Sequence, residues 1–241
     1  MDDNQTTEPL QFFVYVVESP SAPDIYHGRS EGALVARAID LDEIPSATRT
    51  VINREALTAA LNIGLPEVMK QFPDRFPILH LSAHGSREGI QLSNGEVLTW
   101  RELRELITPI NLNLGGYLLL CMSACKGYSA CQMAMQNDDS PHPYFAMVGN
   151  FGTPTWADTA VAYSSFYHLL SKGHSIPDAV EGMKAACGDG QWVLETAEDA
   201  KKGYLEYLKQ IEPSQVQQAL ETATTQSDLP PSAKALEHGF A

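Results

Sequence analysis

Five apolar runs mark the folded part of the chain. They are rich in β-branched and aromatic residues and lie at 12–17, 49–53, 77–83, 116–124 and 144–150. Within each run the apolar residues are continuous rather than alternating, which is typical of strands that are covered on both faces. The pattern therefore predicts five strands of a sheet that is buried on both sides.

Helical periodicity occupies the segments between these runs. Apolar residues recur at spacings of three and four within 31–39, 54–72, 99–107, 159–173 and 176–186, as they do in helices that dock one face on a sheet. Because strands and helices alternate along the chain, the predicted fold is α/β. We expect a three-layer sandwich with a mostly parallel central sheet and helices on both faces.

Two local signals refine this prediction. Thr99, followed three residues later by Glu102, predicts a capping box at the start of a helix. Asn94-Gly95 lies between two short β-prone pieces and predicts a hairpin.

The two ends differ in composition from the middle of the chain. Residues 1–10 are polar and acidic, and residues 211–241 combine Pro, Ser, Thr and Gln with few large apolar residues. We expect both ends to be mobile and disordered, and one folded domain to span 11–210. The first residues lack the basic and apolar regions of a secretory signal, and no apolar run approaches the roughly 18 residues of a membrane span. We therefore expect a soluble, cytoplasmic protein without membrane contact.

Composition and charge narrow the possible partners. With 241 residues, 44% of them hydrophobic, the chain can bury one core. The formal net charge of −14 repels a phosphate backbone, so direct binding of nucleic acid is not expected. Four cysteines at irregular spacings do not make the disulfide framework of a small secreted domain, so reduced thiols are expected. Nothing in the sequence predicts a cofactor.

Two predicted strands end in reactive side chains. The run 77–83 leads into His84-Gly85, and the run 116–124 leads into Cys125. Because the carboxyl ends of neighbouring parallel strands meet at one edge, an imidazole and a thiol would lie within reach of each other there. His84 could then act as general base and Cys125 as nucleophile, while the backbone amides of Gly85 and Cys125 could hold a developing oxyanion. The neighbouring imidazole and a following helix would also make the Cys125 thiolate form more readily than that of a free cysteine.

Other roles for these residue types are common. A buried cysteine is more often a small hydrophobe than a nucleophile, and we expect this of Cys121. Cys187 is expected to be structural or exposed, and Cys131 is left open. His80 shares a strand face with His84 but lies mid-strand, so we expect a hydrogen-bonded core residue.

A zinc site at Cys121, Cys125, Cys131 and His142 is a further alternative. The first two cysteines lie along an apolar strand without the tight cysteine pairs of a structural zinc site. We therefore predict no metal site.

Several segments of the chain resemble a known family. Residues 123–127, Ser-Ala-Cys-Lys-Gly, are similar to the caspase nucleophile segment, with a histidine upstream at a comparable distance. Residues 80–85 followed by 89–92 and Trp100, and residues 156–158 followed by 166–176, look more like the CHAT branch of the caspase clan. The likeness spans roughly 11–190.

The resemblance implies a caspase-like fold and a cysteine endopeptidase that works through a His84/Cys125 dyad without an obligatory third member, by way of an acyl-enzyme. It also implies a protein or peptide substrate, a role as an effector in bacterial defence or cell death, and a separate activator or sensor protein, since no repeat array adjoins the domain. The loop 126–143 departs from the family, because it is short and lacks a Gly-rich run. Two rival functions remain: a catalytically inactive caspase-like module that binds peptides or regulates, and a thiol hydrolase that is not a peptidase.

The sequence allows three predictions for the pocket that holds the substrate residue before the scissile bond. Arg29 in the pocket would favour an acidic residue before the scissile bond, whereas Asp24 or Asp158 would favour Lys or Arg. Alternatively, Arg29 pairs with a surface acid such as Glu31 and Asp158 caps the helix that starts near Thr159. In that case the pocket is apolar and lined by Ile25, Tyr26, Phe151 and Trp156.

Overall fold

A computed structural model describes residues 10–210 of the chain, so the predictions for 1–9 and for 211–241 fall outside the described residues. The strands are β1 (Phe12–Ser19), β2 (Ser46–Thr50), β3 (Phe76–Gly85), β4 (Gly89–Gln91), β5 (Val97–Thr99), β6 (Leu119–Ser123), β7 (Ala146–Asn150) and β8 (Trp192–Thr196). The helices are α1 (Ala22–Tyr26), α2 (Glu31–Asp40), α3 (Arg54–Ala59), α4 (Leu65–Gln71), α5 (Trp100–Asn113), α6 (Trp156–Ser171), α7 (Ile176–Cys187) and α8 (Ala197–Gln210), with a π-helical turn η1 (Ala60–Gly64) and a 3₁₀ helix η2 (Gly127–Met133).

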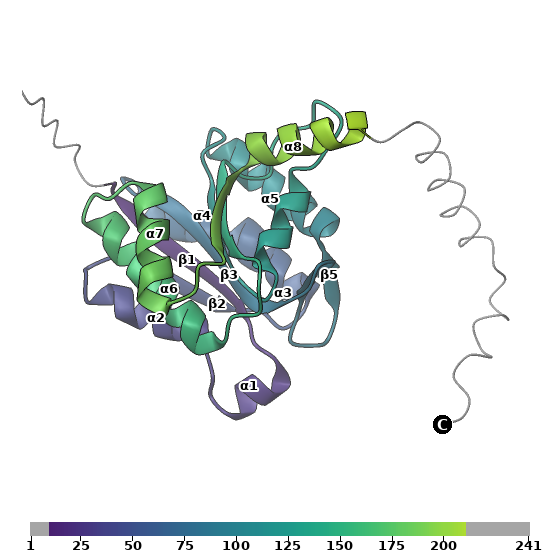
Figure 1. The fold of residues 1–241 in the computed structure, drawn as a ribbon. Helices are drawn as coiled ribbons and strands as arrows, with labels where there is room; N and C mark the ends of the chain where they lie inside the picture. The colour runs from purple at the N-terminus through teal and green to yellow at the C-terminus, as the bar shows by residue number, and fades with distance from the viewer. Residues whose placement is uncertain (1–9, 211–241) are drawn as a thin grey trace, which may run out of the picture.

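The central sheet has the strand order β2-β1-β3-β6-β7-β8. The first five of these strands are parallel to their neighbours, and only β8 runs antiparallel, beside β7. Helices cover both faces (Figure 1). The predicted α/β sandwich with a mostly parallel sheet is therefore confirmed.

Alternate residues of the strands supply two separate cores. Phe13, Tyr15 and Leu79 pack with α3, α4 and α5 on one face. Val14 and Ile78 point to the other face and pack with α2, α6 and α7. This alternation is the period of two that any strand imposes, and it fixes which side chains reach which layer.

The predicted local signals are also confirmed. Thr99 and Glu102 form the capping box at the start of α5. Strands β4 and β5 pair antiparallel around the Asn94-Gly95 turn, where Gly95 adopts a φ of 86° that suits glycine.

The predicted helix over 54–72 is divided by the π-helical turn η1. The buried Tyr15 hydroxyl donates a hydrogen bond of 2.8 Å to the carbonyl oxygen of Ala60. A Cβ on Gly64 would overlap that same hydroxyl. We infer that the tyrosine hydroxyl, inserted into the helical ladder, widens it locally, a common cause of such turns.

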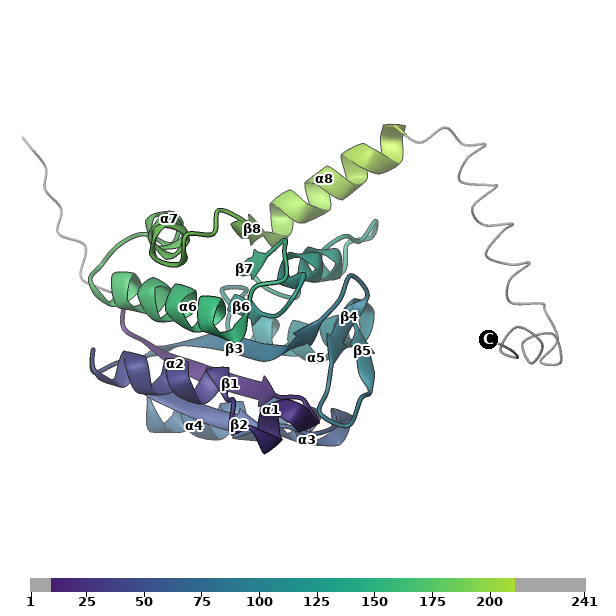
Figure 2. The ribbon, with the colours of Figure 1, turned by 60° about the horizontal axis from the view of Figure 1, so that its bottom comes forward.

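Three elements differ from the prediction for the same reason. Strand β2 lies at Ser46–Thr50 rather than 49–53, and β8 and α8 were not predicted at all. All three lie at the margins of the fold, where little is buried: α8 buries only Ala197 and Ala200. Figure 2 shows α8 leading away from the layers. Elements that contact the rest of the fold on one side only bury few residues, and their apolar runs are short. Within residues 10–210, no helix is both long and apolar enough to cross a membrane.

Candidate active site

His84 and Cys125 come together at the carboxyl ends of two adjacent parallel strands. Ser82 of β3 pairs with Ser123, the last residue of β6; His84 lies two residues further along β3, and Cys125 lies in the turn two residues beyond the end of β6. They line one cavity of about 220 Å³, together with Ala83, Ala124, Pro154, Thr155, Trp156 and Thr159.

The turn after Cys125 is held in an unusual conformation. Lys126 has a φ of 54°, in the left-handed region that a residue with a Cβ adopts at a cost of about 1–2 kcal/mol. Two hydrogen bonds offset this cost: Lys126 N–H donates to Gly152 O at 2.8 Å, and its Nζ donates to Phe151 O at 2.9 Å. The loop after β7 therefore fixes the turn that presents the thiol.

Gly85 allows the two strand ends to approach each other. A Cβ at this position would overlap the carbonyl oxygen of Cys125 and lie 2.9 Å from the Cβ of Ala124. Only a residue without a side chain fits there. The backbone that follows the histidine therefore packs directly against the backbone that carries the thiol.

Asp24 is the side chain that holds the histidine. His84 Nε2 donates to Asp24 Oδ2 at 2.8 Å, and the same oxygen accepts hydrogen bonds from the hydroxyl and amide of Ser21, the N-cap of α1. Nε2 thus carries a proton, which leaves Nδ1 as the basic nitrogen of the neutral ring. The edge of the Trp156 ring system contacts the His84 ring from another side, with ring centroids 5.2 Å apart.

The ionisation of Asp24 suits this contact. Burial disfavours its charged form, but hydrogen bonds from Ser21 and His84 and the charge of His84 outweigh the burial and lower the pKa of Asp24 below its ordinary 3.8. Asp24 therefore stays a carboxylate at neutral pH and stabilises a protonated His84. Asp24 was predicted only as a substrate-binding candidate, and the resemblance implied a dyad without an obligatory third member; in the structure the Asp24 carboxylate is hydrogen-bonded to the histidine.

Asp24→Asn is expected to lower kcat about 10- to 1000-fold, with a smaller change in KM, because the ring loses the acceptor that fixes its orientation and stabilises the imidazolium. Once Asp24 is protonated it no longer stabilises the positive charge of the His84 imidazolium. The ratio of the wild-type rate to the Asp24→Asn rate should therefore be high at neutral pH and fall to one as the pH falls through the lowered pKa of Asp24. Asp24→Glu should restore part of the rate. Initial rates measured against pH give both readouts.

Asp178→Asn is the matched control for this change. Ser175-Ile176-Pro177-Asp178 caps α7 with the same pattern that Ser21-Ala22-Pro23-Asp24 uses at α1, but within residues 10–210 the exposed Asp178 has no hydrogen bond or ion pair with a histidine. The loss of a cap alone therefore predicts unchanged kcat in Asp178→Asn. Equal losses of rate in the two variants would mean that Asp24 acts only as a helix cap.

The Cys125 thiol is not yet activated in this structure. Its hydrogen-bond partner is the carbonyl oxygen of Pro154, at 4.0 Å, and among residues 10–210 no hydrogen bond joins the thiol to His84. Burial raises the pKa of Cys125 above its ordinary 9.0, although the charge of Lys126 acts in the opposite direction. The expectation of a readily formed thiolate is therefore wrong for this resting arrangement, because desolvation outweighs the nearby positive charge.

A buried polar network lies beneath the dyad on the same sheet face. His80 Nε2 donates to Glu31 at 3.3 Å, His80 Nδ1 is hydrogen-bonded to the Tyr167 hydroxyl at 2.9 Å, and Ser123 donates to Glu31 at 3.0 Å. Burial opposes the charge of Glu31, but His80 and the two nearby serines lower its pKa. The prediction that His80 is a hydrogen-bonded core residue is confirmed, and Glu31 is the partner that sequence reasoning missed.

The other cysteines do not join the site. Cys121 is fully buried, which confirms its place in the core, and burial raises its pKa to about 12. Cys131 is also buried, and the half-buried Cys187 accepts a hydrogen bond from Trp192 Nε1 at 3.2 Å. Among the described residues no group of His, Cys, Asp and Glu side chains has the arrangement of a metal site.

The remaining substrate-binding candidates lie in different places relative to the cavity of the dyad. Trp156 lines the cavity of the dyad. Asp158 completes a capping box with Thr155, the N-cap of α6, and lines neither this cavity nor the groove beside it. Arg29 is exposed and lines that neighbouring groove of about 580 Å³, which also touches Trp156. Ile25 and Tyr26 of α1 are exposed and line neither hollow.

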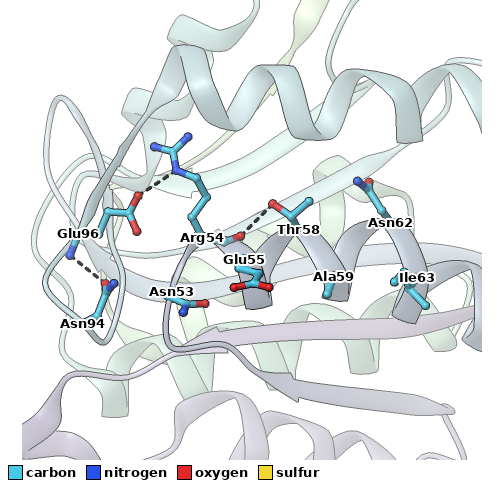
Figure 3. A pocket seen from close by; sticks show the side chains of 9 residues that line it. All are labelled: Asn53, Arg54, Glu55, Thr58, Ala59, Asn62, Ile63, Asn94 and Glu96. Atoms are coloured by element: carbon cyan, nitrogen blue, oxygen red, sulfur yellow. Dashed lines mark hydrogen bonds and ion pairs between the residues drawn. The ribbon is translucent and has the colours of Figure 1, made fainter.

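A hollow larger than the cavity of the dyad lies away from it. It measures about 700 Å³, between the α3–η1 segment and the turn after β4 (Figure 3). Arg54 on its wall is bonded to Glu96 at 2.9 Å and to Glu102 at 2.6 Å. Its lining carries neither cysteine nor histidine: Asn53, Arg54, Glu55, Thr58, Ala59, Asn62, Ile63, Asn94 and Glu96. Size alone therefore does not identify the reactive site.

Comparisons with known proteins add little to this geometry. No model of a known protein family matches the chain, and no curated protein matches its sequence. Among solved structures, the chain is similar to one described as "Complex of Porphyromonas gingivalis RgpB pro- and mature domains", with 13% sequence identity and a TM-score of 0.47. The match covers 79% of this chain and 48% of that chain, so this chain spans about half the length of its structural neighbour. The function is therefore inferred from the geometry of the site.

Proposed function

We propose that this protein is a cysteine peptidase of the caspase-like kind, with Cys125 as nucleophile and His84 as general base. One observation carries the proposal: an imidazole near the end of β3 and a thiol in the turn just beyond the adjacent parallel strand β6 line the same cavity. A carboxylate on the far nitrogen of the ring supports it, since such a partner orients a general-base histidine and stabilises the imidazolium that forms.

The chemical steps follow from this arrangement. His84 Nδ1 accepts the thiol proton, and the Cys125 sulfur attacks the carbonyl carbon of the scissile peptide bond. The negative oxygen that forms is stabilised by the backbone amides of Gly85 and Cys125. His84 then donates its proton to the departing amine, which leaves a thioester on Cys125. Water, deprotonated by the same nitrogen, hydrolyses the thioester and regenerates the thiol.

The finer assignments come from the motif resemblance described above. We propose that the protein is an endopeptidase of the CHAT branch that cleaves a protein substrate in the cytoplasm, and that it acts as an effector of bacterial defence or cell death. An activator is in keeping with the resting thiol, since the pKa of Cys125 is raised and the thiol is not bonded to His84. Binding of substrate or activator would bring the two side chains into contact.

A fluorogenic peptide library with every residue varied at each position tests the proposal. We expect the wild-type protein to cleave a subset of the library and to be inactivated by peptidyl electrophiles that become attached to Cys125, as mass spectrometry of the labelled peptide would show. If small thioesters or esters are hydrolysed while the whole library stays intact, the protein is a thiol hydrolase of another kind. If neither peptides nor small esters are hydrolysed, even after cell extract is added to supply an activator, a binding module is the better description.

A further inference from the structure

Asn150 is a fully buried amide that the chemical steps above do not use. It is the last residue of β7, and both of its polar atoms have partners. Its Nδ2 donates to Asp189 Oδ2 at 2.8 Å, and its Oδ1 accepts from the amide of Gly152 at 2.6 Å. Loss of either partner would leave a desolvated polar group unpaired, so these two bonds fix the side chain in place.

The two partners of Asn150 lie on different loops. Gly152 is in the loop between β7 and α6, and Asp189 is in the loop between α7 and β8, 39 residues from Asn150 in the sequence. Asp189 Oδ1 also accepts from the amide of Gln191 at 2.9 Å, and Gln191 O accepts from the amide of Phe151 at 3.1 Å. The first loop is therefore bonded to the second at two places, through the Asn150 side chain and through the Phe151 backbone.

The loop between β7 and α6 in turn holds the turn that carries the thiol. Gly152 O and Phe151 O both accept from Lys126, the residue after Cys125, at 2.8 and 2.9 Å. Pro154 O, further along the same loop, is the hydrogen-bond partner of the Cys125 thiol. The position of this loop therefore decides both the conformation of the turn and the surroundings of the sulfur.

Gly152 leaves the loop little freedom to shift while the Asn150 bonds are intact. A Cβ at this position would lie 2.9 Å from Gln191 Oε1 and 3.1 Å from Asn150 Oδ1. The backbone of the loop is thus packed directly on these two side chains, and only a residue without a side chain fits there.

We propose that Asn150, held by Asp189, is a positioning residue for the Cys125 thiol: it fixes the loop between β7 and α6, and through that loop the turn that carries the nucleophile. The proposal rests on the assignment of Cys125 as nucleophile and adds a residue on which the geometry of that nucleophile depends. Without the Asn150 bonds the loop moves away from the thiol, water gains access to the sulfur, and the left-handed turn at Lys126 relaxes. Because burial is what raises the pKa of Cys125, the released thiol ionises more readily, but it no longer lies where His84 can take its proton.

The test follows the alkylation of each cysteine by iodoacetamide, read by mass spectrometry. Asn150→Asp removes the donor and places a carboxylate against that of Asp189. We expect the alkylation rate of Cys125 at neutral pH to rise at least about threefold, while Cys121 and Cys131 stay protected because the core remains folded. On a cleaved library peptide, kcat should fall about 10- to 100-fold, since a small displacement of the reacting groups is costly. Loss of stability alone would instead expose all three cysteines.

Asn111→Asp is the matched control. Asn111 is also buried, and its side chain likewise donates to a backbone carbonyl, His142 O at 2.8 Å, and accepts from a backbone amide, Leu118 N at 2.9 Å. Leu118 directly precedes β6, whereas Cys125 follows that strand. Asn111→Asp should therefore lower stability and leave the alkylation rate of Cys125 unchanged.

Two further variants test the pair itself. Asn150→Asp combined with Asp189→Asn exchanges the amide and the carboxylate, so the bonds to Gly152 and Gln191 and the bond between the two side chains again each have a donor and an acceptor. The alkylation rate of Cys125 should return to within about twofold of the wild-type rate. Asp189→Ala changes a half-buried position that folding tolerates, and it should raise the Cys125 rate in the same direction as Asn150→Asp.

The alkylation rates separate this proposal from the peptidase function, because they need no substrate. An unchanged Cys125 rate in Asn150→Asp and Asp189→Ala, an equal rise in Asn111→Asp, or a rise that the exchanged pair does not reverse would overturn the positioning role. Equal kcat of the wild type and Asn150→Asp on a cleaved peptide would do the same and leave the peptidase function intact. If the alkylation rates follow the expected pattern but the wild type cleaves no peptide, only the peptidase function fails.

Discussion

Cys125→Ala lowers peptide cleavage by at least about 10⁴-fold, because no other group in the cavity can form the acyl-enzyme. The fold should be unaffected. The thiol is half-buried and makes a single long contact to Pro154, so its removal should change the free energy of unfolding by less than about 1 kcal/mol. Turnover of the best library peptide and thermal unfolding of the same sample provide the two measurements.

Cys187→Ala is the matched control for this variant. Cys187 is also half-buried, but it accepts a hydrogen bond from Trp192 at the end of α7. We therefore expect Cys187→Ala to retain its rate and to lose some stability. Full turnover in Cys125→Ala would remove the nucleophile assignment, and with it the proposed mechanism.

His84→Ala and His80→Ala should produce opposite patterns. Loss of the general base lowers kcat about 10²- to 10⁴-fold in His84→Ala, while stability changes little because the ring is partly exposed. His80→Ala leaves the carboxylate of Glu31 buried without the imidazole that donates to it, and it should lower the free energy of unfolding by about 3–5 kcal/mol. Steady-state rates at a temperature where both variants are folded, and denaturant unfolding of each, measure the two effects.

The two variants contradict the assignment if their patterns are exchanged. A His80→Ala protein that is stable but inactive would identify His80 as the base. A His84→Ala protein with the wild-type rate would indicate that Cys125 reacts without imidazole, or that the site is not catalytic.

The reactive pair could be predicted from the sequence because it depends on strands alone. The apolar runs locate β3 and β6, and each run ends at a reactive side chain. Parallel pairing of adjacent strands then places the two side chains near each other, since it brings the carboxyl ends of the strands to one edge of the sheet. Trp156 follows in the same way from its place at the start of α6.

The partner of the histidine could not be found by such reasoning. Ser21-Ala22-Pro23-Asp24 and Ser175-Ile176-Pro177-Asp178 have the same local pattern, and both cap a helix. Only the path of the chain after β1 brings Asp24 against His84, sixty residues away in the sequence. Contacts of this kind depend on loop geometry, which periodicity does not encode. The same holds for Glu31, whose burial under α6 is a tertiary effect.

The thiol's environment was mispredicted for a related reason. The neighbouring imidazole and an expected following helix suggested easy ionisation, but the partial burial of the thiol raises its pKa, and that desolvation is the larger effect. Desolvation depends on everything packed around a group, so it cannot be judged from the residues next to it in the chain.

The register of β3 against β6 determines where the two reactive side chains lie. From the paired residues Ser82 and Ser123, each reactive side chain lies two positions further on. Inserting or deleting one residue after Ser82 would turn His84 to the opposite face of the sheet, and the same change after Ser123 would displace Cys125 in the turn that follows β6. Loops that begin beyond Gly85 and Gly127 can change in length without disturbing this count. Distant relatives of the chain should therefore be aligned on these two strands.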